Sequence, residues 1–271
     1  MSQNMNLQER YSKLVDAKLR QESIFEKLFN HRHEGDPKAG AVKIPYRAEA
    51  TVGAYDIANG GTLTNPSTAY TTLVTDNDIY VNELIDHYVA AAVPDGLVAE
   101  RLDSAGFAMA DDIDVDLAAL CVSGGTAQTG SGTASTAATI YDNMVDAVQA
   151  AKALKVKRTE MWFAISNAAY GLLLKSDDFQ RATTGDLEKW GAGFVGMVGG
   201  VPVFETANMP ANTEYILGNS AFCHFVSEWI VPVALKDLAD GKHIGASAVQ
   251  GRKVWGAAIS KASTVLYHKS A

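Results

Sequence analysis

The most suggestive chemistry in the chain is a triplet of alternating aspartates. Asp112, Asp114 and Asp116 have the spacing that opens a calcium-binding loop. However, Leu117 stands where the loop needs glycine, and Ser123 stands where it needs a bidentate glutamate. Because the loop lacks both its turn and its closing ligand, we interpret the three aspartates as solvated residues on a helix.

A glycine-rich stretch at 124–135 suggests a phosphate-binding loop. The pattern GxGxxG would need glycine at Ser135, the element before the stretch is a predicted helix, and no Lys-Ser/Thr pair follows. We therefore interpret this stretch as a flexible linker between two parts of the chain.

Metal ligands are a third possibility. A polar segment holds four candidates, His31, His33, Glu34 and Asp36. Alternating residues in a hinge lack a defined ligand geometry, so the segment is interpreted as a polar linker. Cys121 and Cys223 form no CxxC pair, which argues against a zinc ribbon or a disulfide framework and favours a reducing compartment.

A nucleophile is the last possibility. The run GNSAF at 218–222 resembles a nucleophile elbow, except that Phe222 stands where glycine is required. The other histidines, which have no supporting spacing, are His87, His224, His243 and His268. Large apolar residues that could line a pocket are interpreted as core, namely Trp162, Phe163, Tyr170, Trp190 and Met197. The sequence therefore predicts no catalytic, cofactor-binding or metal-binding residue and no cofactor.

Composition narrows the class of protein. The chain has 271 residues, 47% of them hydrophobic, and 23 basic against 31 acidic residues give a net charge of −8. This length can bury a core, and the acidic balance disfavours direct DNA or RNA binding. Residues 1–6 lack the features of a secretory signal, and no apolar run approaches the ~18 residues of a membrane span. We expect a chain that is made and kept in the cytoplasm.

The N-terminal region has helical periodicity. Apolar residues recur at steps of three and four from Leu7 to Phe29, which predicts an amphipathic helix. The polar segment 31–37 then resembles a hinge. Because this hinge separates the helix from the rest of the chain, we expect the helix to act in assembly rather than in the subunit core.

A long hairpin follows. Residues 41–48 and 71–84 have the β-branched and aromatic content of strands, and the segment from Gly53 to Tyr70 between them is rich in Gly, Asn and Thr. It far exceeds the ~2 to 5 residues of a usual hairpin loop. Its few apolar residues cannot offset the entropy of ordering it, so we expect neighbouring molecules to order it.

The remaining elements predict an α+β class without a βαβ repeat. Apolar residues at helical spacing predict a helix over 95–121, about 40 Å long, with Asp95 as its N-cap. The expected later helices are 137–154 and 167–175. The expected strands are 161–166, 194–198, 201–205, 214–217, 222–228 and an interrupted 253–267, with a Gly199-Gly200 turn in the second pair.

This order of elements resembles the major capsid proteins of tailed bacteriophages, which share the Hong Kong 97-type fold. The resemblance rests on VKIPYRAEATVGAYDIANGG with its return TLVTDNDIYVNELIDHYVAAAV, on LVAERLDSAGFAMADDIDVDLAAL, and on GFVGMVGGVPVFETANMP with EYILGNSAF. It implies an N-terminal arm at 1–35, an extended E-loop hairpin at 36–83, and a P-domain with a spine helix at 84–122. An A-domain at 123–230 and a return into the P-domain at 231–271 complete the division.

The resemblance implies a structural protein rather than an enzyme. Copies would form hexamers and pentamers of an icosahedral head enclosing double-stranded DNA, without sequence-specific DNA binding and without a membrane. A separate scaffolding protein, a portal and a cement protein are the implied partners, and the implied location is the virion after assembly in the host cytoplasm. Two alternatives stay open: an encapsulin-like nanocompartment shell, and a soluble hydrolase with a lid loop at 53–70.

One feature of the hairpin bears on how such a shell is held together. Some members of this capsid family join subunits by isopeptide bonds from an E-loop lysine to a neighbour's asparagine. Here the segment 45–81 contains no lysine, because Lys43 lies at the hairpin base and the next lysine is Lys152. Without an amine at the tip we predict a non-covalent shell.

Overall fold

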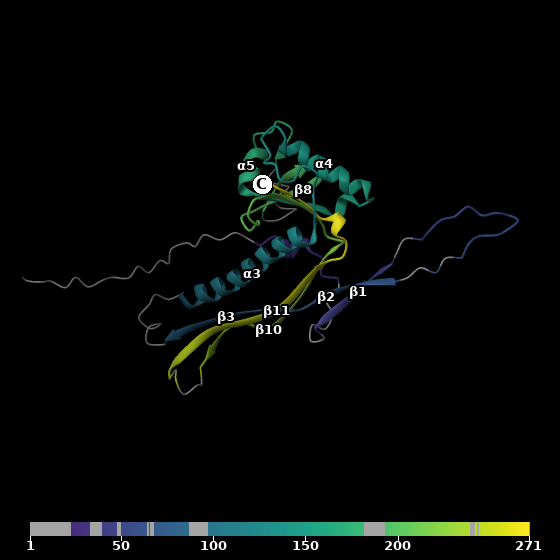
Figure 1. The fold of residues 1–271 in the computed structure, drawn as a ribbon. Helices are drawn as coiled ribbons and strands as arrows, with labels where there is room; N and C mark the ends of the chain where they lie inside the picture. Colours follow the sequence, from purple (N-terminus) through teal and green to yellow (C-terminus); the bar gives the residue numbers. More distant parts are fainter. Residues whose placement is uncertain are drawn as a thin grey trace, which may run out of the picture.

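The structure is a computed structural model that describes residues 23–32, 40–47, 50–63, 65, 68–86, 97–181, 193–238, 242 and 244–270. One part of the body is built on a seven-stranded sheet and the other on a three-stranded sheet with a long helix (Figure 1). A two-stranded hairpin projects from this body. The predicted α+β class is confirmed, and no helix in the described ranges is long and apolar enough to cross a membrane.

The seven-stranded sheet has the order β4-β12-β9-β5-β8-β7-β6. Its strands are β4 (Thr126–Ala127), β5 (Met161–Ser166), β6 (Gln180–Arg181), β7 (Phe194–Val198), β8 (Val201–Thr206), β9 (Thr213–Asn219) and β12 (Leu266–Lys269). Strand β5 lies at its centre, and its side chains alternate between two cores. Phe163 packs with α4 (Ile140–Ala153) and α5 (Asn167–Leu173), whereas Trp162 packs on the opposite side. The sheet is therefore covered on both faces, which explains why β5 is an uninterrupted apolar run.

Local signals in this part of the chain predict the observed elements well. Ser166 caps α5 by accepting a hydrogen bond from the Ala169 N–H at 3.4 Å. Strands β7 and β8 meet in a two-residue turn in which Gly199 and Gly200 have φ of 56° and 77°. Such a turn needs positive φ at both positions, so the predicted Gly-Gly turn is confirmed.

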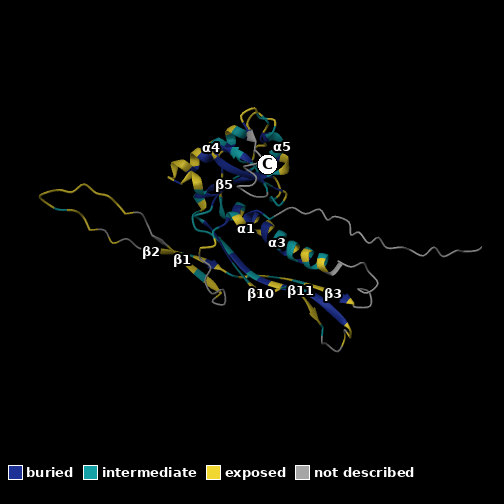
Figure 2. Ribbon diagram, turned by 180° about the vertical axis from the view of Figure 1, so that it is seen from behind, coloured by how far each residue is buried: buried dark blue, intermediate teal, exposed yellow. Residues whose placement is uncertain are grey.

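The three-stranded sheet has the order β10-β11-β3, from β3 (Asn77–Asp86), β10 (Cys223–Asp237) and β11 (Ala246–Ile259), all antiparallel. Helix α3 (Leu97–Gly124) lies along one face of it (Figures 1 and 2). Ile85 and Val249 of the sheet pack with Ala105 of the helix. The predicted long helix is confirmed, and its apolar stripe is buried at Met109, which is 3% exposed. Its predicted cap, Asp95, lies outside the described residues.

The structure differs from the prediction where the hairpin joins the body. Strands β1 (Ala41–Arg47) and β2 (Thr68–Val74) pair antiparallel, but the predicted strand 71–84 is two strands in different sheets. The chain breaks at Thr75, where the backbone passes so close to β11 that a Cβ at Gly256 would lie 2.1 Å from the Val74 carbonyl oxygen. The prediction of one strand is wrong because this crossing of two chain segments is a tertiary contact.

Two other predicted strands have different bounds. Strand β10 continues to Asp237 rather than ending at 228, with register irregularities around Pro232, whose missing N–H cannot join a ladder. Strand β11 begins at Ala246 rather than at 253. The expected interruption is confirmed, since a short helical turn at Ala262–Thr264 separates β11 from β12.

The described end of the N-terminal segment contradicts its predicted independence. Helix α1 spans Phe25–Leu28, and Phe25 and Phe29 are 0% and 3% exposed in the same core cluster as Trp162 and Ile113. The expectation that this segment acts only in assembly is therefore wrong for residues 24–29. Residues 1–22 of the predicted arm and 33–37 of the predicted hinge lie outside the described residues.

The predicted flexible linker at 124–135 is also wrong. Its backbone is tied to the C-terminal strand, with Thr126 N–H donating to Val265 C=O at 2.8 Å and Gly132 N–H donating to Lys269 C=O at 2.8 Å. Gln128 and Ser135 are buried. The segment is an ordered connection, because hydrogen bonds to a distant strand stabilise what its own few apolar residues could not.

Candidate assembly interface

Among the described residues, several highly exposed large apolar side chains gather on the hairpin tip, which we define as residues 50–63. Val52, Tyr55, Ile57 and Leu63 are 94%, 75%, 94% and 98% exposed. In Figure 1 the tip lies far from the body of the molecule, and Figure 2 shows it as almost entirely exposed. A group of exposed large apolar side chains is typical of a protein–protein contact.

The tip nevertheless carries a local turn. Asp56 C=O accepts a hydrogen bond from Gly60 N–H at 2.8 Å, and its carboxylate accepts from Ala58 N–H at 2.9 Å and from Asn59 Nδ2 at 2.6 Å. The hydrogen bond from Ala58, followed by that from Asn59, lowers the pKa of the Asp56 carboxyl. The turn therefore presents Tyr55 and Ile57 on either side of an ionised residue.

The base of the hairpin is fixed to the body. Ile44 and Leu73, which are 6% and 0% exposed, pack with Val226 of β10 in a small cluster. Seven residue pairs, from Ala41↔Val74 to Arg47↔Thr68, join the two strands, and both anchor residues belong to this ladder. The tip is thus held at the end of an anchored arm, which lowers the entropy that must be lost when it binds a partner.

The N-terminal segment is held by Asp114, one of the aspartates interpreted above as solvated. Asp112 and Asp116 are exposed, but Asp114 is fully buried, so the interpretation is wrong for this residue. Its Oδ1 accepts from the N–H groups of Ile24 at 2.9 Å and Phe25 at 2.7 Å. It also accepts from Ser23 Oγ at 3.0 Å.

The other oxygen of Asp114 faces a loop of the seven-stranded sheet. Asn208 Nδ2 donates to Asp114 Oδ2 at 3.2 Å and to Asp111 Oδ1 at 2.6 Å. Burial raises the pKa of the Asp114 carboxyl. The hydrogen bonds that it accepts from Phe25, Ser23, Asn208 and Ile24 oppose this shift. A signal was present in the sequence: Asp114 stands three residues before Leu117, on the apolar stripe of the helix.

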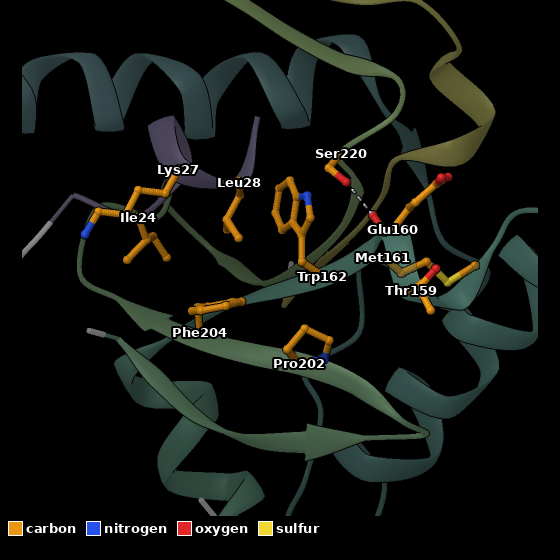
Figure 3. A pocket seen from close by; sticks show the side chains of 10 residues that line it. All are labelled: Ile24, Lys27, Leu28, Thr159, Glu160, Met161, Trp162, Pro202, Phe204 and Ser220. Carbon is orange, nitrogen blue, oxygen red and sulfur yellow. Dashed lines mark hydrogen bonds between the residues drawn. The ribbon is translucent and has the colours of Figure 1, made fainter. Parts of the chain in front are cut away.

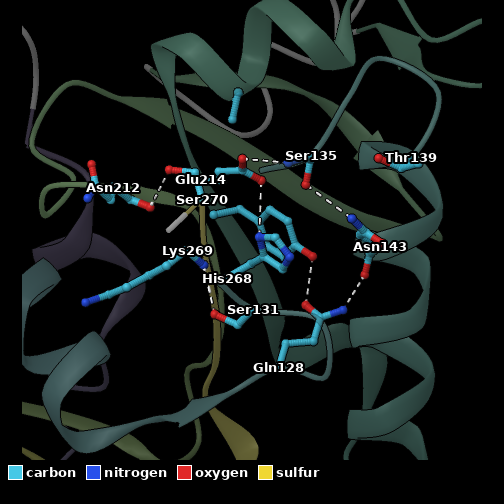
Figure 4. A network of polar contacts seen from close by, with 12 residues as sticks. Gln128, Ser131, Ser135, Thr139, Asn143, Asn212, Glu214, His268, Lys269 and Ser270 are labelled. Atoms are coloured by element: carbon cyan, nitrogen blue, oxygen red, sulfur yellow. Dashed lines mark hydrogen bonds and ion pairs between the residues drawn. The ribbon is translucent and has the colours of Figure 1, made fainter. Parts of the chain in front are cut away.

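A buried polar network, which sequence reasoning missed, fixes the 124–135 connection (Figure 4). His268 Nδ1 lies 3.1 Å from Glu214 Oε2, and Glu214 Oε1 accepts from Ser135 N–H at 2.9 Å. Tyr215 stacks on His268 with ring centroids 5.2 Å apart and donates to Gln128 Oε1 at 2.7 Å. Burial is the main cause that raises the pKa of the Tyr215 hydroxyl above its ordinary range. These contacts are structural, because every member holds another part of the chain.

The residues considered for catalysis do not come together in the described part of the chain. Ser220 Oγ donates to Glu160 C=O at 3.2 Å, and His224 Nε2 contacts Ser260 Oγ at 3.0 Å. His31 is exposed, and no group of three metal-ligating side chains is found among the described residues. His33, Glu34, Asp36, His87, His243 and Trp190 lie outside the described residues.

The remaining candidates lie in the core. Trp162 and Phe163 are buried, and Tyr170 and Met197 are half-buried against the two main clusters, as predicted. Cys121 and Cys223 are free and fully buried in one cluster. The hydrogen bond that the Cys121 thiol makes to Cys223, together with burial, raises the pKa of this thiol, so it is not activated.

Comparison with known proteins identifies the class. The family model described as phage capsid protein matches residues 89–267, so the chain belongs to the phage capsid protein family. The resemblance to tailed-phage major capsid proteins is thereby confirmed, and the protein is a structural capsid protein. No curated protein sequence matches the chain.

Solved structures show the same fold. A chain from Mycobacterium phage Che8 is 21% identical over 99% of this chain and 99% of its own, with a TM-score of 0.79. The capsid structure of the cyanophage P-SCSP1u is 13% identical over 98% of this chain and 93% of its own, with a TM-score of 0.77. The capsid of an empty GTA particle matches at 14% identity over 98% and 95%, with a TM-score of 0.64. The predicted Hong Kong 97-type fold is confirmed.

Proposed function

We propose that copies of this chain form the hexamers and pentamers of an icosahedral phage head that encloses double-stranded DNA. The observation that carries the proposal is the anchored hairpin with an uncovered apolar tip, in a chain of the phage capsid family. A closed shell in which each subunit overlaps the next would bury that tip.

The domain division follows from the same proposal. Residues 1–35 form the N-terminal arm, 36–83 the E-loop, 84–122 the P-domain, 123–230 the A-domain, and 231–271 return into the P-domain. Because β3 pairs with β11 along its whole length, the E-loop joins the P-domain through a shared sheet. Such a joint would transmit a force on the hairpin to the sheet under α3.

The proposal includes further partners and a location. A separate scaffolding protein guides assembly in the host cytoplasm, a portal occupies one vertex, and the mature shell is held without covalent bonds, by overlapping hairpins and arms or by a cement protein. The net charge of −8 supports DNA packaging without tight DNA binding, since acidic surfaces do not displace counterions from phosphates.

Electron microscopy of the purified chain tests the proposal, with and without its co-expressed scaffold. Closed shells with icosahedral symmetry are expected, and particles from infected cells should contain nuclease-protected double-stranded DNA. Shells that contain a protein cargo instead of DNA would indicate an encapsulin-like compartment. A chain that stays monomeric under all these conditions would contradict the proposal.

A further inference from the structure

The two cysteines of the chain meet where its two larger sheets join. Cys121 lies in the last turn of α3, and Cys223 is the first residue of β10. Between these residues the chain runs through every strand of the seven-stranded sheet except β12. The two sulfurs therefore mark the points where the chain leaves the part built on the three-stranded sheet and returns to it.

Packing brings the two side chains together. A Cβ at Gly124 would lie 3.2 Å from Ile259 Cδ1, so the last turn of α3 rests on Ile259. Ile259 pairs directly with Cys223 across the ladder of β10 and β11, and directly paired residues point to the same face of a sheet. Cys121 lies three residues before Gly124, on the same face of the helix. Within this arrangement the Cys121 thiol hydrogen-bonds to Cys223.

Both thiols are shielded from water. Cys121 and Cys223 are 0% exposed in an apolar cluster that includes Trp162 and Phe225. A pocket of about 260 Å³ reaches the edge of this cluster, lined by Trp162 and by Ser220 on the turn that leads into β10 (Figure 3). A small oxidant can therefore approach the thiols, whereas a large one is excluded until the core opens.

We propose that hydrogen peroxide converts Cys121 and Cys223 into a disulfide that staples α3 to β10 within each subunit. The bond lies inside one copy, so it is additional to the contacts between copies that the proposed function requires. A reducing environment keeps both thiols free, and the staple forms when the chain meets peroxide outside such an environment.

The reaction balances with peroxide as the sole oxidant. Cys121 keeps its proton, because its hydrogen bond to Cys223 and its burial raise the pKa of this thiol, so Cys223 attacks first. The Cys223 sulfur displaces hydroxide from the O–O bond and becomes a sulfenic acid, and the Cys121 sulfur then attacks that sulfur and displaces water. Each thiol proton ends in one of the two waters formed, and the electrons that the sulfurs lose reduce the peroxide oxygens. Contact between the sulfurs favours this closure over further oxidation.

The disulfide stabilises the subunit by restricting its unfolded chain. The loop that it closes runs from residue 122 to residue 222, and a long closed loop removes more entropy from the unfolded state than a short one. The bond also fixes the two connections between the sheets to each other. The midpoint of urea unfolding should therefore rise by about 1 M after oxidation.

Peroxide treatment of the purified, unassembled chain tests the staple. After the remaining thiols are blocked in denaturant, digestion and mass spectrometry should find linked Cys121 and Cys223 peptides in a band that stays monomeric on a non-reducing gel. The urea midpoint should rise, and it should return to its original value when dithiothreitol reduces the bond. Cys223→Ser, oxidised in the same way, should show no rise, and it controls for the methionine sulfoxides that peroxide also forms. Cys223→Ala replaces this control if the buried hydroxyl prevents folding.

Three results of the peptide analysis would each overturn the inference. They are free thiols at both positions after peroxide treatment, sulfinic or sulfonic acids without the link, and a link between two copies. An unchanged urea midpoint in the linked chain would overturn its role as a stabilising staple. Because the measurement uses unassembled subunits, a failure to form shells would contradict the proposed function alone.

Discussion

The N-terminal segment 23–29 and the hairpin tip 50–63 both look peripheral in the sequence, and both carry large apolar side chains. In the structure they have opposite environments: Phe25 is 0% exposed, whereas Ile57 is 94% exposed. The difference is a polar anchor. Asp114 binds the backbone N–H groups that open α1, so Phe25 is drawn into the core, while the hydrogen bonds of Asp56 all lie within the tip itself.

This comparison shows how a capsid subunit can assign separate roles to similar segments. Burying an apolar side chain inside the subunit stabilises the fold, and leaving one outside on an anchored arm reserves its burial for assembly. The first three predictions below each test one of these regions or both, and the later ones test other parts of the subunit.

Loss of the tip should have the largest effect. Replacing residues 48–67 by Asn-Gly joins the paired residues Arg47 and Thr68 through a two-residue turn that suits a hairpin. The subunit should fold with an unchanged melting temperature, because the tip contributes no core residue, but particles should be absent by electron microscopy. Normal particles from this variant would show that the tip is dispensable.

Truncation of one apolar side chain should destabilise the isolated subunit when it is made in the N-terminal segment, but not when it is made in the hairpin tip. Phe25→Ala should lower the free energy of unfolding of the isolated subunit by about 3 to 5 kcal/mol, because it leaves a cavity in the core. Ile57→Ala should change it by less than about 0.5 kcal/mol, since the side chain is solvated. Urea denaturation of unassembled subunits measures both, and equal losses would break the comparison.

Removal of the anchor should have an intermediate effect. Asp114→Ala leaves the N–H groups of Ile24 and Phe25 buried without an acceptor, which should cost about 1 to 3 kcal/mol in the same denaturation experiment. Asp112→Ala, two residues away on the exposed side, is the control and should be nearly neutral. A neutral Asp114→Ala would show that packing alone holds α1.

An exposed ion pair should contribute least to stability. Arg252 of β11 donates from Nε and Nη2 to the carboxylate of Asp78 on β3, and these hydrogen bonds hold the pKa of Asp78 below its ordinary 3.8. The contribution is present above that ordinary value and is lost as the pH falls through the lowered pKa.

Arg252→Met should therefore lower the melting temperature slightly near pH ~7, and the difference from the unaltered chain should shrink as the pH falls below 3.8. Lys236→Met, a cation on the neighbouring strand β10, controls for the loss of positive charge. A difference that persists in acid would assign the effect of Arg252→Met to packing of its side chain.

No covalent joining is predicted in the mature shell, because 45–81 holds no lysine. Particles boiled in detergent and reductant should release subunits that run at 28.9 kDa as a single band. A ladder of larger species would contradict this prediction, and Lys43→Arg would then test the lysine of strand β1 as the donor.

Elements with a strong local pattern could be read from the sequence by itself. Strand β5 matched its predicted bounds, the Gly199-Gly200 turn followed from its need for positive φ, and the long helix followed from apolar residues at helical spacing. The Gly-, Asn- and Thr-rich composition of 53–70 also predicted a long loop at the tip of the hairpin. In each case the determining interactions lie within a few residues along the chain, so periodicity and turn chemistry carry the information.

Only the tertiary structure decided which distant residues meet. It placed Asp114 against Ile24, brought His268 to Glu214 and Cys121 beside Cys223, and divided the strand at Thr75 where the backbone crosses Gly256. These contacts join segments far apart in the chain, and local patterning does not encode such pairings. Burial then reverses the expected role of a residue, because an aspartate removed from water must bind donors that the fold supplies.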